Sequence, residues 1–189
     1  MRFLPTFAAT LLLAAPLAAQ QPAALVAAPS TRATTVLSVS PPRERGQPAP
    51  AAKTVTIDYG QPHARGRAVP TELATDGTIW RTGANSATTL TSQVDLTIGG
   101  AKVPAGAYSL YTIREGGKYV LIINKNTGQW GTEYDQARDH ARVPLRMRTT
   151  PETTESLQIA LVPQAEGPAK GVLTIAWGKL HLSADWSAP

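Results

Sequence analysis

The sequence contains no cysteine. Disulfide bridges, thiol nucleophiles and thiolate metal ligands are therefore excluded, and the folded state must be held by its core alone. Phenylalanine is almost as scarce, since Phe3 and Phe7 are the only two and both lie near the N-terminus. The rest of the chain must build its core with tryptophan and tyrosine, whose N–H and O–H groups need hydrogen-bond partners when they are buried.

Long apolar runs and blocks of like charge are missing as well. No segment approaches the roughly 20 apolar residues that a membrane-spanning helix requires, so we expect no transmembrane segment. The formal net charge of +5 at pH 7 is spread along the chain and predicts no particular anionic partner. Arg142, Arg146 and Arg148 share one face of an expected strand, which is typical of a solvated or edge-protecting face, and we expect no nucleic-acid binding.

The first 19 residues have the layout of a secretory signal peptide. Arg2 is followed by an apolar run that includes residues 11–15, and the segment ends on the small pair Ala18–Ala19. The alternative is a buried N-terminal helix, which Pro5 and Pro16 would interrupt. We therefore expect cleavage near Ala19 and export to the periplasm or the outside of the cell.

Residues 20–52 are rich in alanine and proline and poor in bulky apolar side chains. Such a composition cannot recover its ordering entropy by burial, so the sequence predicts a flexible tether. The alternative is that residues 35–40 pair with an edge strand. A single domain is expected to occupy residues 53–189.

The expected domain alternates apolar and polar residues in short segments. The clearest alternation runs over residues 90–98 and predicts a half-buried antiparallel strand, whereas the continuous apolar run 119–123 predicts a central strand covered on both faces. Glycine pairs and turns at 98–101 and 177–180 predict tight hairpins. Residues 133–141 are the one candidate helix. The fold class is therefore all-β, an antiparallel sandwich or jelly roll of about nine strands with at most one short helix.

Several motifs, in order along the chain, carry a family resemblance. They are Tyr59 with Pro62 and Gly66–Arg67, then Trp80–Asn85, Ile98–Gly100, Val103–Leu110, Gln129–Gly131, Tyr134–Asp135, Asp139 and Arg142. Over residues 55–186 the sequence resembles the bacterial family known as domain of unknown function 2911. The resemblance implies an exported β-protein, and because that family has no established activity it leaves the function open.

Arg81 is the first candidate for ligand binding. Beside Trp80 and ahead of Asn85, it could present a planar fork to a carboxylate, a sulfate or sugar hydroxyls, with the indole as a stacking platform. The alternative is an internal ion pair to Asp135 or Asp139. Asn85 suits a left-handed turn as well as a ligand contact, and Arg67 is open to the same two interpretations.

The irregular segment around Trp130 supplies the remaining candidates for a ligand site: Trp130, Tyr134, Asp135, Asp139 and Arg142. We prefer a non-catalytic module that binds a small molecule, a glycan or an envelope protein. The reason is that aromatic residues and arginines, which can donate two parallel hydrogen bonds, are concentrated in irregular segments. One alternative is a hydrolase using Glu133, Asp135, Asp139 or His63 as acid or base. The other is a purely structural envelope component. The sequence shows no catalytic set, and we predict neither a metal nor a cofactor.

Overall fold

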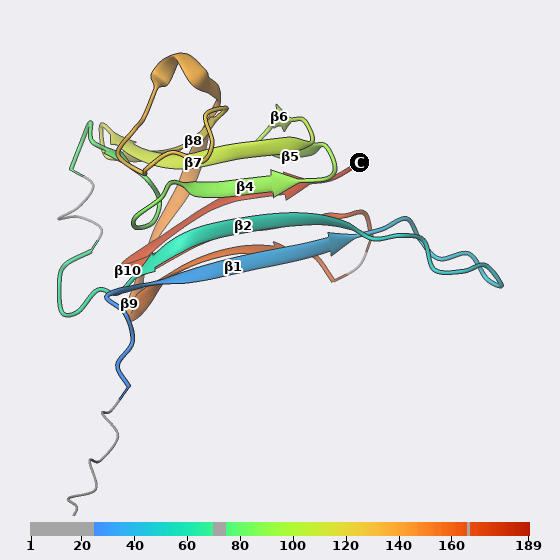
Figure 1. Ribbon diagram of the computed structural model, residues 1–189, viewed down its shortest axis with the longest axis horizontal. Coiled ribbons are helices and arrows are strands. Elements are labelled where there is room, and N and C mark those ends of the chain that lie inside the picture. Colours follow the sequence, from blue (N-terminus) through green and yellow to red (C-terminus); the bar gives the residue numbers. More distant parts are fainter. Residues whose placement is uncertain (1–24, 70–74, 166) are drawn as a thin grey trace, which may run out of the picture.

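The computed structural model describes residues 25–69, 75–165 and 167–189 (Figure 1). The expected signal peptide lies outside the described residues. The regular secondary structure of the described residues consists of strands and one short 3-10 helix, η1 (Gln136–Arg138). The strands are β1 (Ser30–Val39), β2 (Lys53–Pro62), β3 (Ile79–Trp80), β4 (Thr88–Ser92), β5 (Leu96–Ile98), β6 (Ala101–Val103), β7 (Gly106–Glu115), β8 (Lys118–Asn124), β9 (Asp139–Pro163) and β10 (Lys170–Ser187).

All strand pairs are antiparallel, and they join in the order β1-β2-β4-β7-β8-β9-β10-β5-β6, with β3 beside β7. The long strand β9 belongs to both layers. Its first part pairs with β8, for example Leu121 with Val143, and its later part pairs with β10, for example Ile159 with Ile175. The result is one open sheet folded over itself, which confirms the predicted all-β antiparallel class.

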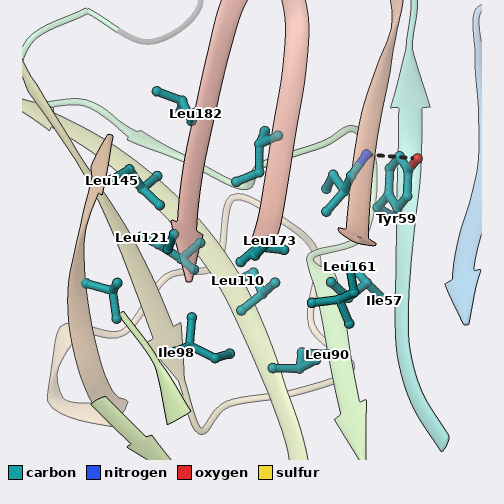
Figure 2. Packing of buried hydrophobic residues seen from close by; sticks show 14 of the residues in the cluster. Ile57, Tyr59, Leu90, Ile98, Leu110, Leu121, Leu145, Leu161, Leu173 and Leu182 are labelled. Atoms are coloured by element: carbon teal, nitrogen blue, oxygen red, sulfur yellow. Dashed lines mark hydrogen bonds between the residues drawn. The ribbon is translucent and has the colours of Figure 1, made fainter. Parts of the chain in front are cut away.

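The core lies between the two layers (Figure 2). Side chains from both layers are almost completely buried there: Val55, Ile57, Leu90, Leu110 and Leu121 from one, and Leu157, Ile159, Leu173, Ile175 and Trp177 from the other. Hydrogen bonds join the two layers as well: the backbone N–H of Ile159 donates to the hydroxyl of Tyr59 at 3.2 Å, and the side-chain amide of Gln61 donates to the Leu157 carbonyl at 2.9 Å. Tyrosine and tryptophan replace the missing phenylalanine, as the composition predicts.

Strand β8 is covered on both faces, as its continuous apolar run predicts. Leu121 and Ile123 point into the main core, whereas Ile122 joins a second cluster with Ala87, Tyr111 and Ile113 on the opposite face. Tyr134, from the segment between β8 and β9, packs against this second cluster. The irregular segment between β8 and β9, which the sequence predicted as a candidate site, thus covers the outer face of the layer that contains β8.

Two segments differ in extent from the expectation. Residues 30–39, inside the expected tether, form β1 and pair with β2 along their whole length, because Leu37 is buried in the core and Ala33 and Val39 pack against it. This is the edge-strand alternative, extended in length. The alternation over residues 90–98 is divided between β4 and β5, which lie in different layers. The period-two alternation of apolar residues is kept across the break, since Leu90, Leu96 and Ile98 all belong to the same core cluster.

The predicted hairpin at Gly178–Lys179 is wrong, because β10 runs through it without turning back. Gly178 has a φ of 59° and marks a shift of register between β10 and β9. A side chain at Gly178 would meet the backbone carbonyl of Val69. A glycine with positive φ therefore serves here as a bulge where another segment comes close. The hairpin at Gly99–Gly100 does form, between β5 and β6.

Candidate functional site

The loop from Arg81 to Ala87 leaves the end of β3 and crosses the end of β2. Thr82 and Asn85 have positive φ angles of 50° and 64°. Ala84 donates its backbone N–H to Gly60 at 3.0 Å, and Gly60 has no room for a side chain under the Ala84 carbonyl. The turn interpretation of Asn85 agrees with its left-handed backbone. This loop is held by backbone contacts, so the position of Arg81 is fixed from both sides.

Trp80 lies in the core and not at the surface. Its side chain is 6% exposed and stacks on Trp177, with ring centroids 5.8 Å apart and an interplanar angle of 18°. Its indole N–H donates to the Gly83 carbonyl at 3.3 Å. The expected stacking platform for a ligand is therefore used to join the two layers.

Arg81 lines an open pocket of about 290 Å³. The other lining residues are Ile79, Trp80, Gly83, Gly131, Thr132 and Tyr134. The stem of Arg81 lies against Gly131, where a side chain would collide with it. Gly131 in turn donates its backbone N–H to the Asn85 carbonyl at 3.0 Å. The glycine in this motif thus gives Arg81 the space to extend along the pocket wall.

The guanidinium of Arg81 has no hydrogen bond or ion pair in the part of the chain that the structure describes. Arg114, the other half-buried arginine there, lies 3.9 Å from Asp76. The expected internal partners of Arg81, Asp135 and Asp139, bond elsewhere. No acidic side chain lines the pocket. Among the described residues, therefore, neither Asp135 nor Asp139 forms the expected internal ion pair with Arg81.

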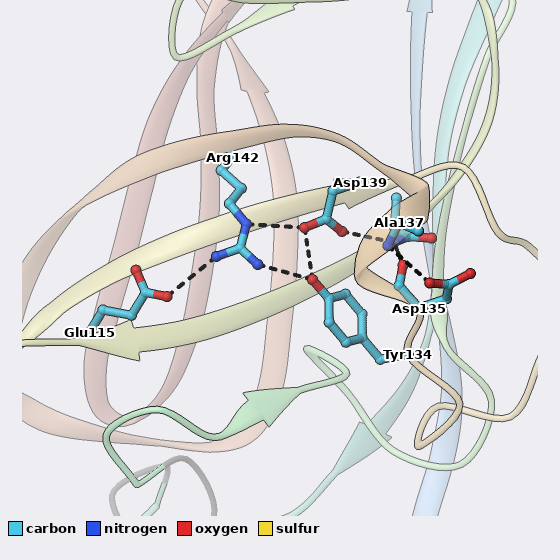
Figure 3. A network of polar contacts seen from close by, with 7 residues as sticks. Glu115, Tyr134, Asp135, Ala137, Asp139 and Arg142 are labelled. Atoms are coloured by element: carbon cyan, nitrogen blue, oxygen red, sulfur yellow. Dashed lines mark hydrogen bonds and ion pairs between the residues drawn. The ribbon is translucent and has the colours of Figure 1, made fainter.

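Asp139 is the centre of a polar network on the outer face (Figure 3). It accepts hydrogen bonds from the Tyr134 hydroxyl at 2.7 Å, from the Asn124 amide at 2.8 Å and from Nε of Arg142 at 3.0 Å. Arg142 also donates to the Tyr134 oxygen at 3.0 Å and to Glu115 at 3.3 Å. The network satisfies every one of these side chains with protein partners, so it fixes the segment between β8 and β9 to the sheet.

Tyr134 belongs to both the network and the Arg81 pocket. Its ring packs edge-on against Tyr111 at 5.1 Å. Burial first, and then the hydrogen bond to Asp139, raises the pKa of the Tyr134 phenol to about 12, although Arg142 opposes the change. Tyr134 therefore adds no charge to the lining of the Arg81 pocket at physiological pH.

This shift makes a pH-dependent prediction. A folded-state pKa above the usual value of 10 means that the contribution of Tyr134 to stability is complete below about pH 10 and is lost as the pH rises towards 12. Spectrophotometric titration of tyrosine absorbance, taken as wild type minus Tyr134→Phe, should show a midpoint near pH 12. A midpoint near 10 would mean that the phenol is not enclosed by the network.

The other predicted residues have separate positions. Arg67 donates from Nε to the Ala64 carbonyl at 3.0 Å and from Nη2 to the His63 carbonyl at 2.8 Å, which closes its own loop. The His63 ring bonds Ser156 at 2.8 Å. Asp135 accepts from the backbone N–H of Ala137 and so caps η1. None of these three lines the Arg81 pocket.

Trp130 is half exposed at 50%, and its backbone bridges to Ser86 beside the Arg81 loop. Its side chain is the most exposed aromatic one in this region. The structure therefore brings together Arg81, Tyr134 and the neighbourhood of Trp130, and it assigns Asp139 and Arg142 to the supporting network.

Sequence reasoning missed Asn124 and Glu115 in the network, and Thr132 in the pocket. Asn124 follows the apolar run of β8 directly and is fully buried. A polar amide at the end of a buried strand is itself a signal, because burial of such a group requires partners. Glu115 and Thr132 carry no comparable signal, since exposed acids and threonines are common in turns.

Among the described residues, no group of three or more histidines and acids could hold a metal ion. In the same part of the chain no helix is both long and apolar enough to cross a membrane.

Comparison with known proteins gives one family. The family model described as "Protein of unknown function (DUF2911)" matches residues 40–185, which cover the strands from β2 to β9 and most of β10. No curated protein and no solved structure gives a significant match.

Proposed function

The chain belongs to the DUF2911 family of proteins of unknown function, and we propose that it is an exported, non-catalytic module that binds a small carboxylate-bearing ligand through Arg81. The observation that carries this proposal is that Arg81 is partly buried, lines a pocket and has no acceptor among the described residues. An anionic ligand would supply the acceptor that the described residues do not give this side chain.

The pocket favours a planar anion over other ligands. A guanidinium can donate two parallel N–H bonds to a carboxylate, which gives orientation as well as affinity. The lining adds the Thr132 hydroxyl and the apolar edges of Ile79 and Trp80, and it contains no acid that would repel the ligand. Trp130, half exposed next to Gly131, offers a flat apolar surface for a sugar ring. An acidic sugar, such as a uronic acid unit of an envelope glycan, combines these features.

The hydrolase alternative needs two acids, or an acid and His63, at one concave site. Asp139 already accepts hydrogen bonds from Tyr134, Asn124 and Arg142, and the His63 ring is hydrogen-bonded to Ser156. These placements favour the binding proposal. The network around Asp139 also favours a structural role for Asp139 and Arg142, which is compatible with ligand binding at Arg81.

Replacing Arg81 with glutamine should weaken the binding of glucuronate by about 10- to 100-fold, because hydrogen bonds to a charged group contribute about 1.5–3 kcal/mol. Titration calorimetry with glucuronate, and with glucose as the uncharged probe, measures this effect. Arg138→Gln is the matched control, since Arg138 is exposed and does not line the pocket.

Equal affinity for glucuronate in the wild type and in Arg81→Gln would rule out this site. Loss of binding in Arg138→Gln as well would point to general electrostatic attraction. Export is tested separately by fractionating cells that produce the full chain and determining its N-terminal residue. Export predicts periplasmic protein that starts after Ala19, and protein that stays in the cytoplasm with an intact N-terminus would contradict it.

A further inference from the structure

Strand β1 forms one margin of the folded sheet. It pairs with β2 over its whole length and with no other described strand, so one side of its backbone has no strand beside it in the described chain. Figure 1 shows β1 in this position next to β2. The opposite margin of the sheet, β6, is only three residues long. The long free edge of the molecule is therefore that of β1, and it shares no residue with the Arg81 pocket.

The alternation of backbone hydrogen bonds identifies the groups at this edge. In β2 the carbonyl of Thr54 accepts from the N–H of Gln93 at 3.0 Å, on the side of β4. Successive residues of an antiparallel strand bond to opposite neighbours, so the odd-numbered residues of β2 bond to β1. The register pairs odd with odd, for example Ile57 with Thr35. The N–H and C=O groups that point to the free edge are therefore those of Arg32, Thr34, Val36 and Ser38.

Side chains cap two other strand edges, but not this one. The His140 ring bonds to the Lys102 carbonyl of β6 at 2.8 Å. At the later part of β9, the side-chain amide of Gln61 donates to the Leu157 carbonyl at 2.9 Å. None of the described side chains bonds to an outward backbone group of β1. The strand also has no proline, glycine or lysine, the residues with which native edges prevent pairing.

Apolar side chains are exposed on the same segment. Of the six large apolar side chains that are exposed in the described chain, three lie on β1 or shortly before it: Leu25, Val26 and Val36. Val36 is 59% exposed and stands on the outer face of the strand, because the odd-numbered residues face the core. A long unpaired edge with an exposed β-branched side chain is a template for another strand.

The charge of this edge indicates which strand that is. Arg32 is the one charged side chain of β1, and Asp58 in β2 already forms an ion pair with it. A charged peptide would find no free counter-charge along the edge. A second copy of β1 is itself a neutral, β-branched strand, and it brings no unpaired charge to the interface. The same patch can then serve both copies about a two-fold axis.

We propose that two copies of this chain associate through β1, antiparallel about a two-fold axis, with Arg32 opposite the partner's Ser38 and Thr34 opposite the partner's Val36. This register gives a partner to every outward N–H and C=O group from residue 32 to residue 38. It also keeps the two Arg32 side chains at opposite ends of the paired segment and brings the two Val36 side chains together as diagonal neighbours. The sheet then continues from one copy into the other.

Sedimentation equilibrium of the purified full chain, from micromolar to millimolar concentration, tests the proposal. We expect reversible association from one chain to two. Val36→Pro removes an outward N–H but no bond to β2, and it should abolish the dimer. Val36→Lys should weaken the dimer by about tenfold, because two lysines would lie diagonally across the axis where two valines were covered. Val36→Thr is the matched control and should associate nearly as the wild type does.

Position 38 tests the register. Ser38→Lys places a like charge opposite the partner's Arg32 and should weaken the dimer by about threefold or more, whereas Ser38→Glu should not weaken it. Arg81→Gln should associate normally, because this interface is independent of the Arg81 pocket. The proposal is overturned if the wild type remains a single chain or grows beyond two. It is also overturned if Val36→Pro or Val36→Lys, folded by circular dichroism, associates unchanged, or if the two Ser38 variants associate equally.

Discussion

Replacing Trp177 with alanine is expected to lower the free energy of unfolding by about 3–5 kcal/mol, the range for removing a large aromatic side chain from a packed core. Trp177 is 2% exposed and stacks on Trp80, so its loss removes the contact that joins β10 to the start of the Arg81 loop. It also removes the hydrogen bond from its indole to the Glu155 carbonyl. Urea denaturation followed by circular dichroism measures the change.

Trp130→Ala is the matched control for this experiment. The side chain is half exposed, at 50%, so its truncation should change the unfolding free energy by no more than about 0.5–1 kcal/mol. Similar losses for the two variants would mean that Trp177 does not occupy the interface between the layers.

Replacing Asp139 with alanine is expected to cost about 2–3 kcal/mol of stability. The change leaves Tyr134, Asn124 and Arg142 without their shared acceptor, and buried polar groups without partners are costly. The cost is less than the figure for a fully buried ion pair, because the side chain of Arg142 is 33% exposed and water can reach it. Thermal or urea unfolding of the purified variant gives the value.

Asp135→Ala provides the comparison, since Asp135 lies four residues away and its side chain accepts one backbone hydrogen bond, from Ala137. Loss of a single capping bond is expected to cost about 1 kcal/mol or less. If both variants lose the same small amount, Asp139 is a solvated loop acid and the network does not support the segment between β8 and β9.

Local sequence patterns predicted the strands well where the chain itself determines burial. The run at 119–123 has too few polar residues to tolerate water on either face, and β8 is covered on both. Glycines at 99 and 100 allow the positive φ angles of a tight hairpin, of 54° and 87°. The same reasoning failed at Gly178, because positive φ suits a bulge as well as a turn, and only the approach of Val69 decides between them.

The sequence predicted which residues belong to the candidate site, but it did not predict which of them contact one another. The sequence identified Arg81, Tyr134, Asp139 and Arg142 as a group with unusual side chains in irregular segments. It could not show that Asp139 forms an ion pair with Arg142 and not with Arg81, because the positions of these side chains depend on the pairing between β8 and β9. The burial of Trp80 also depends on a residue far along the chain, Trp177.

Ligand binding at this site requires that the Arg81 guanidinium is available to a carboxylate. Nuclear magnetic resonance of arginine Nε–H groups during titration with glucuronate tests it directly, once the Arg81 signal has been assigned by its absence from Arg81→Gln. We expect the Arg81 signal to shift and saturate, and the signal of Arg142, which is bonded to Asp139 and Glu115, to stay in place. An Arg81 signal that does not move, or a shift shared equally by both arginines, would contradict it.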